Sequence, residues 1–169
     1  FYNFGELFLL AKKTYEQGLH TVSLGAWNKK MIERECQPIA SVDVIDFPYE
    51  AKEYTFLQKD FQSYKNKKEF TLAVYLKFYG KRLPCIIPYM LSEAAKLLEQ
   101  KGIRLNVCYF GEAGSFKAPG GKNLGMLSKE ELRKLYYQAD FGMVASMSNI
   151  SLVPYEMLAA GLPVIEFAD

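Results

Sequence analysis

The segment from Ser146 to Ile165 contains a candidate anion-binding site. It leaves an apolar strand, crosses a small polar loop and enters a helix, whose first backbone N–H groups have no partner within the helix. With the helix dipole, these groups make an anion-binding site. Ser151 is predicted to cap this helix, and Glu156, about one turn further in, is predicted to face the ligand rather than solvent. The alternative is a Ser-capped helix with a first-turn glutamate that the dipole favours.

The other chemistry-bearing residues form neither a metal site nor a known phosphate loop. One histidine, His20, and three cysteines, Cys36, Cys85 and Cys108, are present, and no cysteine belongs to a C-x-x-C pair. This pattern argues against a Cys/His zinc site, and His20 is predicted to be structural. The stretch 111–123 holds several glycines but is neither a G-x-x-x-x-G-K-[ST] loop nor a G-x-G-x-x-G dinucleotide motif.

Composition indicates a soluble, globular chain. Half of the 169 residues are apolar and 24% are charged, which is typical of globular domains. The net charge of +2 is too small to indicate nucleic acid as a partner. The basic run at 65–68 is predicted to be a solvated linker rather than a phosphate-binding track. No run approaches the roughly 18 to 20 apolar residues of a transmembrane helix.

From residue 70 onward, apolar strands alternate with amphipathic helices. Pro84 suits the first turn of a helix that Gly102 ends, and Ser128-x-x-Glu131 predicts a capping box at the start of the next helix. The order β-α-β-α-β-α-β predicts an α/β domain with a parallel sheet covered by helices on both faces. Ligands of such sheets bind beyond the carboxyl ends of the strands. The predicted strands are 70–76, 104–110, 141–145 and 163–167, the last helix is 154–160, and the loops concerned are 77–84, 111–123, 146–153 and whatever follows 167.

The first 68 residues are less regular. The pattern predicts a helix that Gly18 ends, a strand at 20–24 and a short polar helix at 28–35. Residues 38–68 show no sustained period and are predicted to be a linker region with room for one short helix. We expect both ends to be cut from a longer chain, because the sequence starts without an initiator methionine and stops just after a predicted strand.

The stretch Glu156-Met-Leu-Ala-Ala-Gly-Leu-Pro-Val164 resembles the E-x-M-A-x-G-x-P-V end of the donor-binding signature of family-4 GT-B glycosyltransferases. The run from Leu124 to Asp140 is similar to the G-x-[LV]-S-x-x-E-L-x-x-L-Y-x-x-A-D pattern of that family. Other stretches resemble a subgroup of bacterial surface-polysaccharide enzymes that includes the rhamnosyltransferases using dTDP-rhamnose. These stretches are Ser148 to Glu156, Thr14-Tyr15, Gly25-x-Trp27 and Lys81-Arg82.

The resemblance implies roles for the polar residues. In the family, the second glutamate of an E-x7-E motif holds ribose hydroxyl groups of the donor, and Glu156 matches this position. The first glutamate would fall where this chain has Ser148, which fits a rhamnosyl-type donor and not a generic UDP-hexose. The family also places a basic pair against the donor diphosphate, which implies that Lys81 and Arg82 are the catalytic cations. Fixed cations stabilise the charge that the leaving diphosphate gains. Lys77 is a weaker candidate, and two exposed basic residues before a helix are the alternative.

The same resemblance implies a donor site that spans several loops. Residues 124–127 would flank the nucleobase. An ordinary turn glycine is the alternative for Gly111, and packing at a helix entry is the alternative for Leu127. The implied donor-binding residues are Gly111, Leu127, Ser148, Asn149, Ile150, Ser151, Leu152 and Glu156.

In family terms, residues 69–169 are expected to form the Rossmann-like, carboxyl-terminal half of a GT-B fold. Residues 1–68 are expected to be the end of the amino-terminal domain and the interdomain linker. A glycan or lipid-linked acceptor would bind the missing amino-terminal domain, and the full-length enzyme could associate peripherally with the membrane.

The implied activity is transfer of a sugar, such as rhamnose, from a dTDP- or UDP-linked donor to a growing surface polysaccharide at the cytoplasmic face. Neither a metal nor a further cofactor is expected, because basic residues and helix dipoles do the work of Mg²⁺ and no Asp-x-Asp motif is present. A GT-B nucleotide-sugar epimerase and a degenerate, non-catalytic nucleotide-binding module are the alternatives.

Overall fold

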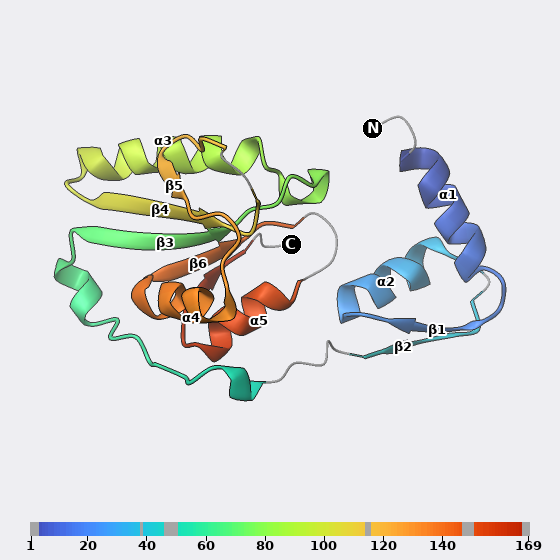
Figure 1. The fold of residues 1–169 in the computed structure, drawn as a ribbon. Helices are drawn as coiled ribbons and strands as arrows, with labels where there is room; N and C mark the ends of the chain where they lie inside the picture. The colour runs from blue at the N-terminus through green and yellow to red at the C-terminus, as the bar shows by residue number, and fades with distance from the viewer. Residues whose placement is uncertain (1–3, 38, 46–50, 114–115, 147–150, 167–169) are drawn as a thin grey trace. The chain divides into compact units, whose positions relative to one another are not determined.

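The computed structural model describes residues 4–37, 39–45, 51–113, 116–146 and 151–166 (Figure 1). The chain divides into two compact units, residues 1–48 and residues 49–169.

The first unit is a β-α-β arrangement preceded by a helix. It contains α1 (Phe4–Tyr15), β1 (His20–Ser23), α2 (Ala26–Glu35) and β2 (Ser41–Val44). Strands β1 and β2 pair in parallel, and Ile32, Cys36 and Val42 form the buried core between helix and strands. Placing all of 38–68 in a linker was wrong, because β2 lies within it. This strand has four residues with one buried side chain, too few for a periodic signal.

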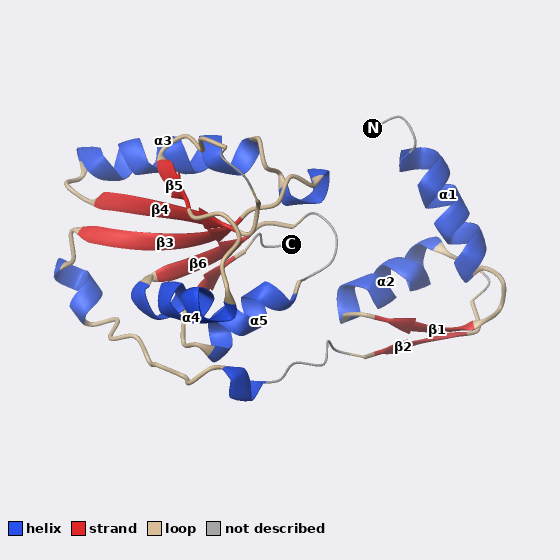
Figure 2. Cartoon of the chain, viewed as in Figure 1, coloured by secondary structure: helices blue, strands red, loops and turns tan. Residues whose placement is uncertain are grey.

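The second unit is a parallel five-stranded sheet flanked by helices (Figure 2). Its strands are β3 (Glu69–Tyr75), β4 (Arg104–Phe110), β5 (Gly121–Asn123), β6 (Phe141–Val144) and β7 (Val164–Ile165), in the spatial order β5-β4-β3-β6-β7. Its helices are α3 (Ile86–Gln100), α4 (Lys129–Gln138) and α5 (Leu152–Ala159), with single turns η1 (Ala51–Glu53), η2 (Ser63–Asn66) and η3 (Gly80–Arg82). The predicted α/β, Rossmann-like fold class is therefore confirmed. Strand β5 was missed, because three residues with a leading glycine carry no strand pattern.

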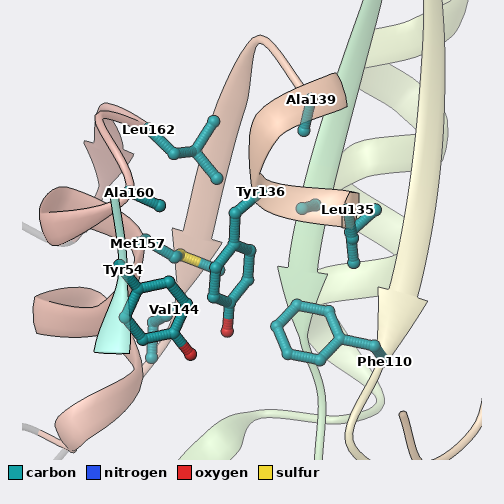
Figure 3. Packing of buried hydrophobic residues seen from close by; sticks show 10 residues of the cluster. Tyr54, Phe110, Leu135, Tyr136, Ala139, Val144, Met157, Ala160 and Leu162 are labelled. Carbon is teal, nitrogen blue, oxygen red and sulfur yellow. The ribbon is translucent and has the colours of Figure 1, made fainter. Parts of the chain in front are cut away.

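Helices cover both faces of this sheet, α3 on one and α4 with α5 on the other (Figure 1). Alternate residues of β3 point to opposite faces, as a strand requires: Leu72 and Val74 pack on the α3 side, and Ala73 packs on the α4 and α5 side. The predicted capping box of α4 is present, with Ser128 and Glu131 each bonding the backbone of the other. The hydrophobic core on the α4 and α5 side of the sheet also contains Phe110, Leu135, Tyr136, Ala139, Val144, Met157, Ala160 and Leu162 (Figure 3).

The strap, which we define as residues 51–67, lies along the α4 and α5 side of the second unit. The Lys59 ammonium donates to three backbone carbonyl oxygens at the end of α4: Tyr136 at 3.3 Å, Tyr137 at 2.7 Å and Ala139 at 2.7 Å. These carbonyls have no partner within the helix, and a cation there is also favoured by the helix dipole. One strap side chain thus caps α4.

The strap also crosses the chain just after α5. The Leu57 backbone N–H donates to the Ala160 carbonyl oxygen at 3.3 Å. Gly161, with φ of +82°, has no room for a side chain, because a Cβ there would lie 2.1 Å from the Leu57 carbonyl oxygen. The glycine of the Ala-Ala-Gly-Leu-Pro run is therefore explained by the passage of the strap.

Candidate functional site

The carboxyl ends of β3 and β6 form the switch point of the sheet. From β3 the chain passes through α3 to β4 on one side, and from β6 it passes through α5 to β7 on the other. The loops that follow β3 and β6 therefore lead to strands on opposite sides of this pair, the arrangement in which open α/β sheets bind ligands. These loops carry the predicted basic pair and the predicted anion site.

Arg82 lies inside this switch point. It belongs to η3, its residue is only 5% exposed, and its Nη1 donates to the Ala145 carbonyl oxygen at 3.1 Å. The guanidinium carbon lies 5.3 Å from the centre of the Tyr75 ring, within the range of a cation–π interaction. The reading of Arg82 as an exposed basic residue is therefore wrong, and its charge bridges the two loops.

The other basic candidates lie on the same loop. Lys81 is exposed beside Arg82, whereas Lys77 is half-buried and its Nζ lies 3.8 Å from Met126 Sδ. The Glu112 carboxylate accepts a hydrogen bond from the Phe78 backbone N–H at 2.9 Å. This bond ties the loop after β3 to the loop after β4, so both loops are anchored around the basic residues.

Ser151 occupies the predicted N-cap position of α5, and Leu152 begins the helix. The predicted position is confirmed, but the Ser151 side chain makes no capping hydrogen bond. Its Oγ is buried and has no hydrogen-bond partner among the residues that the structure describes. A buried hydroxyl without a partner carries a desolvation cost that a bound ligand would remove. The predicted donor-binding residues Ser148, Asn149 and Ile150 lie outside the described residues.

Glu156 is half-buried on α5 and faces two tyrosines. Tyr136 Oη lies 3.4 Å from Glu156 Oε2, and the Tyr54 hydroxyl also hydrogen-bonds this carboxylate. Burial raises the pKa of Glu156 above its ordinary value, while the Tyr136 and Tyr54 hydrogen bonds and the charge of Lys129 act against this shift and Glu53 adds to it. Glu156 also lies beyond the first turn of α5, so the alternative of a solvated first-turn glutamate is wrong.

Two predicted donor-binding residues have packing reasons of their own. Gly111 ends β4 with φ of +102°, and a Cβ there would lie 2.5 Å from Tyr75 Cε2. Leu127 is partly buried and packs against the hydrophobic core on the α4 and α5 side. Packing accounts for both residue types, and their contact with a donor stays a prediction.

An open groove of about 680 Å³ lies beside residues 124–127, at the end of β5. Its volume is in the usual range of small-ligand sites. The Asn123 side chain spans its wall, accepting from the Gly125 N–H at 2.9 Å and donating to the Phe116 carbonyl oxygen at 3.5 Å. The groove is lined by Phe116, Lys117, Ala118, Gly121, Asn123, Leu124 and Gly125. Sequence analysis missed Phe116, because a lone aromatic residue in a glycine-containing loop has no pattern.

Glu166 was also missed. It follows β7 directly at the carboxyl edge of the sheet; burial raises its pKa, and the charge of Arg82 acts in the opposite direction. The predicted strand 163–167 was too long and placed Glu166 inside it, whereas β7 ends at Ile165 and leaves Glu166 at the edge where the strand ends meet.

The described ranges contain neither a cluster of metal ligands nor a helix that could span a membrane. No three His, Cys, Asp or Glu side chains come together there as a metal site. Within the same ranges, every helix is too short or too polar to cross a membrane.

Comparison with known proteins gives structural likeness alone. No family model and no curated protein matches the chain. Sucrose-phosphate synthase from Thermosynechococcus elongatus is 14% identical with a TM-score of 0.67, over 96% of this chain and 44% of that one. The pneumococcal O-GlcNAc transferase GtfA, solved with UDP and GlcNAc, is 17% identical with a TM-score of 0.56, over 88% of this chain and 30% of that one.

A variant of S. aureus TarM, solved with fondaparinux, α-GlcNAc-glycerol and UDP, is 14% identical with a TM-score of 0.63, over 86% of this chain and 29% of that one. The chain therefore spans less than half the length of each of these proteins. Neither the epimerase nor the non-catalytic alternative gains support from them. The parallel sheet and flanking helices of this chain have a glycosyltransferase-like fold. It is the fold of the carboxyl-terminal half of GT-B enzymes.

Proposed function

We propose that this chain is the donor-binding part of a glycosyltransferase that uses a nucleotide-sugar donor. The observation that carries the proposal is the hydrogen bond between Arg82 and the Ala145 carbonyl oxygen, which joins the two switch-point loops. The basic segment, which we define as Lys81 and Arg82, and the start of α5 can then bind the same ligand. The glycosyltransferase-like fold, shared with structures solved in complex with UDP, supports the same function.

In this proposal, the diphosphate binds between the basic segment and the start of α5. A guanidinium has five N–H donors, so Arg82 keeps donors for phosphate oxygens besides the one on Ala145. Lys81 adds an exposed point charge, and the first N–H groups of α5 with the Ser151 hydroxyl complete the anion site. The sugar hydroxyl groups of the nucleoside donate to Glu156, the 2′ and 3′ groups in a uridine donor and the 3′ group alone in a thymidine donor.

The nucleobase lies in the groove beside Leu124, where it contacts Phe116 and Leu127. During transfer, the bond between the sugar and the diphosphate breaks while the acceptor oxygen bonds the sugar. The leaving diphosphate gains negative charge, which Lys81, Arg82 and the α5 dipole stabilise without a metal ion.

The finer assignment rests on Ser148, which replaces the first glutamate of the family motif. Without that carboxylate, a deoxyhexose donor such as dTDP-rhamnose is favoured over a UDP-hexose. The acceptor is a growing surface polysaccharide, bound by a partner domain at the cytoplasmic face of the membrane, and no cofactor other than the donor takes part.

Calorimetric titration tests this function. UDP and dTDP are titrated into the chain, with uridine, thymidine and inorganic pyrophosphate as partial ligands. We expect at least one nucleoside diphosphate to bind far more tightly than its nucleoside. Lys81→Ala should weaken that binding by roughly 10- to 150-fold, as loss of a charged hydrogen bond predicts. Lys101→Ala removes an exposed lysine at the opposite end of α3 and should change nothing. Absence of binding by both diphosphates would overturn the proposal.

A further inference from the structure

Two phenol groups from outside α5 converge on Glu156. Tyr136 comes from α4 and is fully buried, and Tyr54 comes from the strap and is 9% exposed. Their ring centres lie 5.9 Å apart with an interplanar angle of 34°, and their hydroxyl groups point toward the same side of the cluster (Figure 3). Two elements distant in sequence therefore hold one carboxylate.

Packing restricts where these hydroxyl groups can be. The Tyr136 ring lies against the Phe110 ring, with centres 5.9 Å apart at 66°, and has no exposed surface. Next to Tyr54, the Thr55 backbone N–H donates to Tyr137 Oη at 3.1 Å and so fixes the strap on α4. Because both rings are held by their surroundings, the donors to Glu156 are pre-organised.

The carboxylate needs these donors. A half-buried carboxylate loses water, and hydrogen bonds to its charged form compensate for that loss. The other charged groups near Glu156 are Glu53 and Lys129, which form an ion pair of 2.7 Å with each other and are largely exposed. Their opposite charges act on the pKa of Glu156 in opposite directions, and the Tyr136 hydrogen bond is the largest influence that favours the charged carboxylate.

We propose that Tyr136 and Tyr54 are positioning residues of the donor site, which orient the Glu156 carboxylate toward the ribose hydroxyl groups of the nucleotide. The inference rests on the proposed function, in which Glu156 binds ribose, and goes beyond it by making a strap residue part of the site. The Tyr136 phenol donates to Glu156 Oε2, and the carboxylate keeps further lone pairs that can accept from the nucleotide.

A double-mutant cycle tests the inference. UDP and dTDP are titrated into Tyr136→Phe and Tyr54→Phe, each alone and combined with Glu156→Gln. Each phenol removal should weaken binding about 2- to 12-fold when Glu156 is present and have no effect in the Glu156→Gln background. Tyr89→Phe is the control, since it removes an exposed hydroxyl from α3, which covers the opposite face of the sheet.

A second readout needs no nucleotide. Carboxyl carbon NMR of Glu156 should show a higher pKa in Tyr136→Phe and Tyr54→Phe than in the parent chain, and an unchanged pKa in Tyr89→Phe. If Glu156→Gln itself leaves affinity unchanged, the ribose assignment fails and the positioning role fails with it. If Glu156→Gln weakens binding but the phenol variants do not, or act equally in both backgrounds, only the positioning role is overturned.

Discussion

The Arg82 guanidinium donates to the Ala145 carbonyl oxygen at 3.1 Å, and this bond ties the loop after β3 to the loop after β6. The bond separates the roles of two adjacent basic residues. Arg82 is buried against the Tyr75 ring and supports the protein as well as a ligand, whereas Lys81 is exposed at the surface.

Substitution of the two basic residues should therefore give different results. Arg82→Met leaves the Ala145 carbonyl without its donor, so the free energy of unfolding should fall by about 1–3 kcal/mol, and diphosphate affinity should fall with it. Lys81→Ala should change the free energy of unfolding by less than about 0.5 kcal/mol while weakening diphosphate binding. Urea unfolding and calorimetry measure both quantities, and equal stability losses for the two variants would contradict the assigned roles.

Glu156→Gln should weaken nucleotide binding by roughly 1–3 kcal/mol, about 5- to 150-fold, because a charged acceptor for the ribose hydroxyl groups is lost. The free energy of unfolding should instead be higher for the Gln variant than for the parent chain at neutral pH. Burial raises the pKa of Glu156 in the folded chain, so its contribution to stability is fully present below the ordinary pKa and is lost as pH rises through the folded value.

The Gln variant has no such loss, so its stability relative to the parent chain should increase between about pH 4 and about pH 7. Thermal melts of both proteins at these two pH values provide the check. A variant that is less stable at neutral pH and binds nucleotides normally would make Glu156 a structural residue only.

Gly111→Ala should destabilise the second unit more than Gly102→Ala does. Both glycines have positive φ, and an added Cβ costs about 1–2 kcal/mol in that conformation. At Gly102 the Cβ would meet nothing within 4 Å, whereas at Gly111 it would collide with the Tyr75 ring at 2.5 Å. Urea unfolding of both variants isolates the collision, and equal losses would show that Tyr75 moves aside freely.

Lys59→Met should loosen the strap and uncap α4. Its ammonium serves three carbonyl oxygens, so the free energy of unfolding should fall by about 1.5–3 kcal/mol, as for a lost charged hydrogen bond. Lys65→Met removes an exposed lysine from the same strap and should change stability by less than about 0.5 kcal/mol. Chemical unfolding of Lys59→Met and Lys65→Met measures the free energy of unfolding of each. Similar losses would mean that capping by Lys59 contributes little.

Sequence patterns predicted the layers of the second unit because its helices and long strands bury periodic apolar residues. The capping box at Ser128 and the strand Arg104–Phe110 are local features, and both are present as predicted. Strands β2 and β5 were missed because pairing with neighbours, rather than their own residues, makes them strands.

The candidate site was less predictable, because its contacts join distant segments. The burial of Arg82 depends on Tyr75 and on Ala145, more than sixty residues further along the chain. The phenols that face Glu156 come from α4 and from a strap that showed no pattern. No local spacing encodes such convergence, which arises only when the sheet brings loop and helix ends together.

The strap also constrains the order in which the second unit can assemble. Lys59 docks on the end of α4, and Leu57 docks on Ala160, which comes about a hundred residues later in the chain, a separation that loop-closure entropy makes slow to bridge. During synthesis, the strap leaves the ribosome before the residues on which it docks. Its aromatic side chains are then exposed to solvent, as in the folding intermediates that chaperones protect. The part of the second unit that is synthesised first therefore cannot dock fully until the chain has been made as far as Ala160.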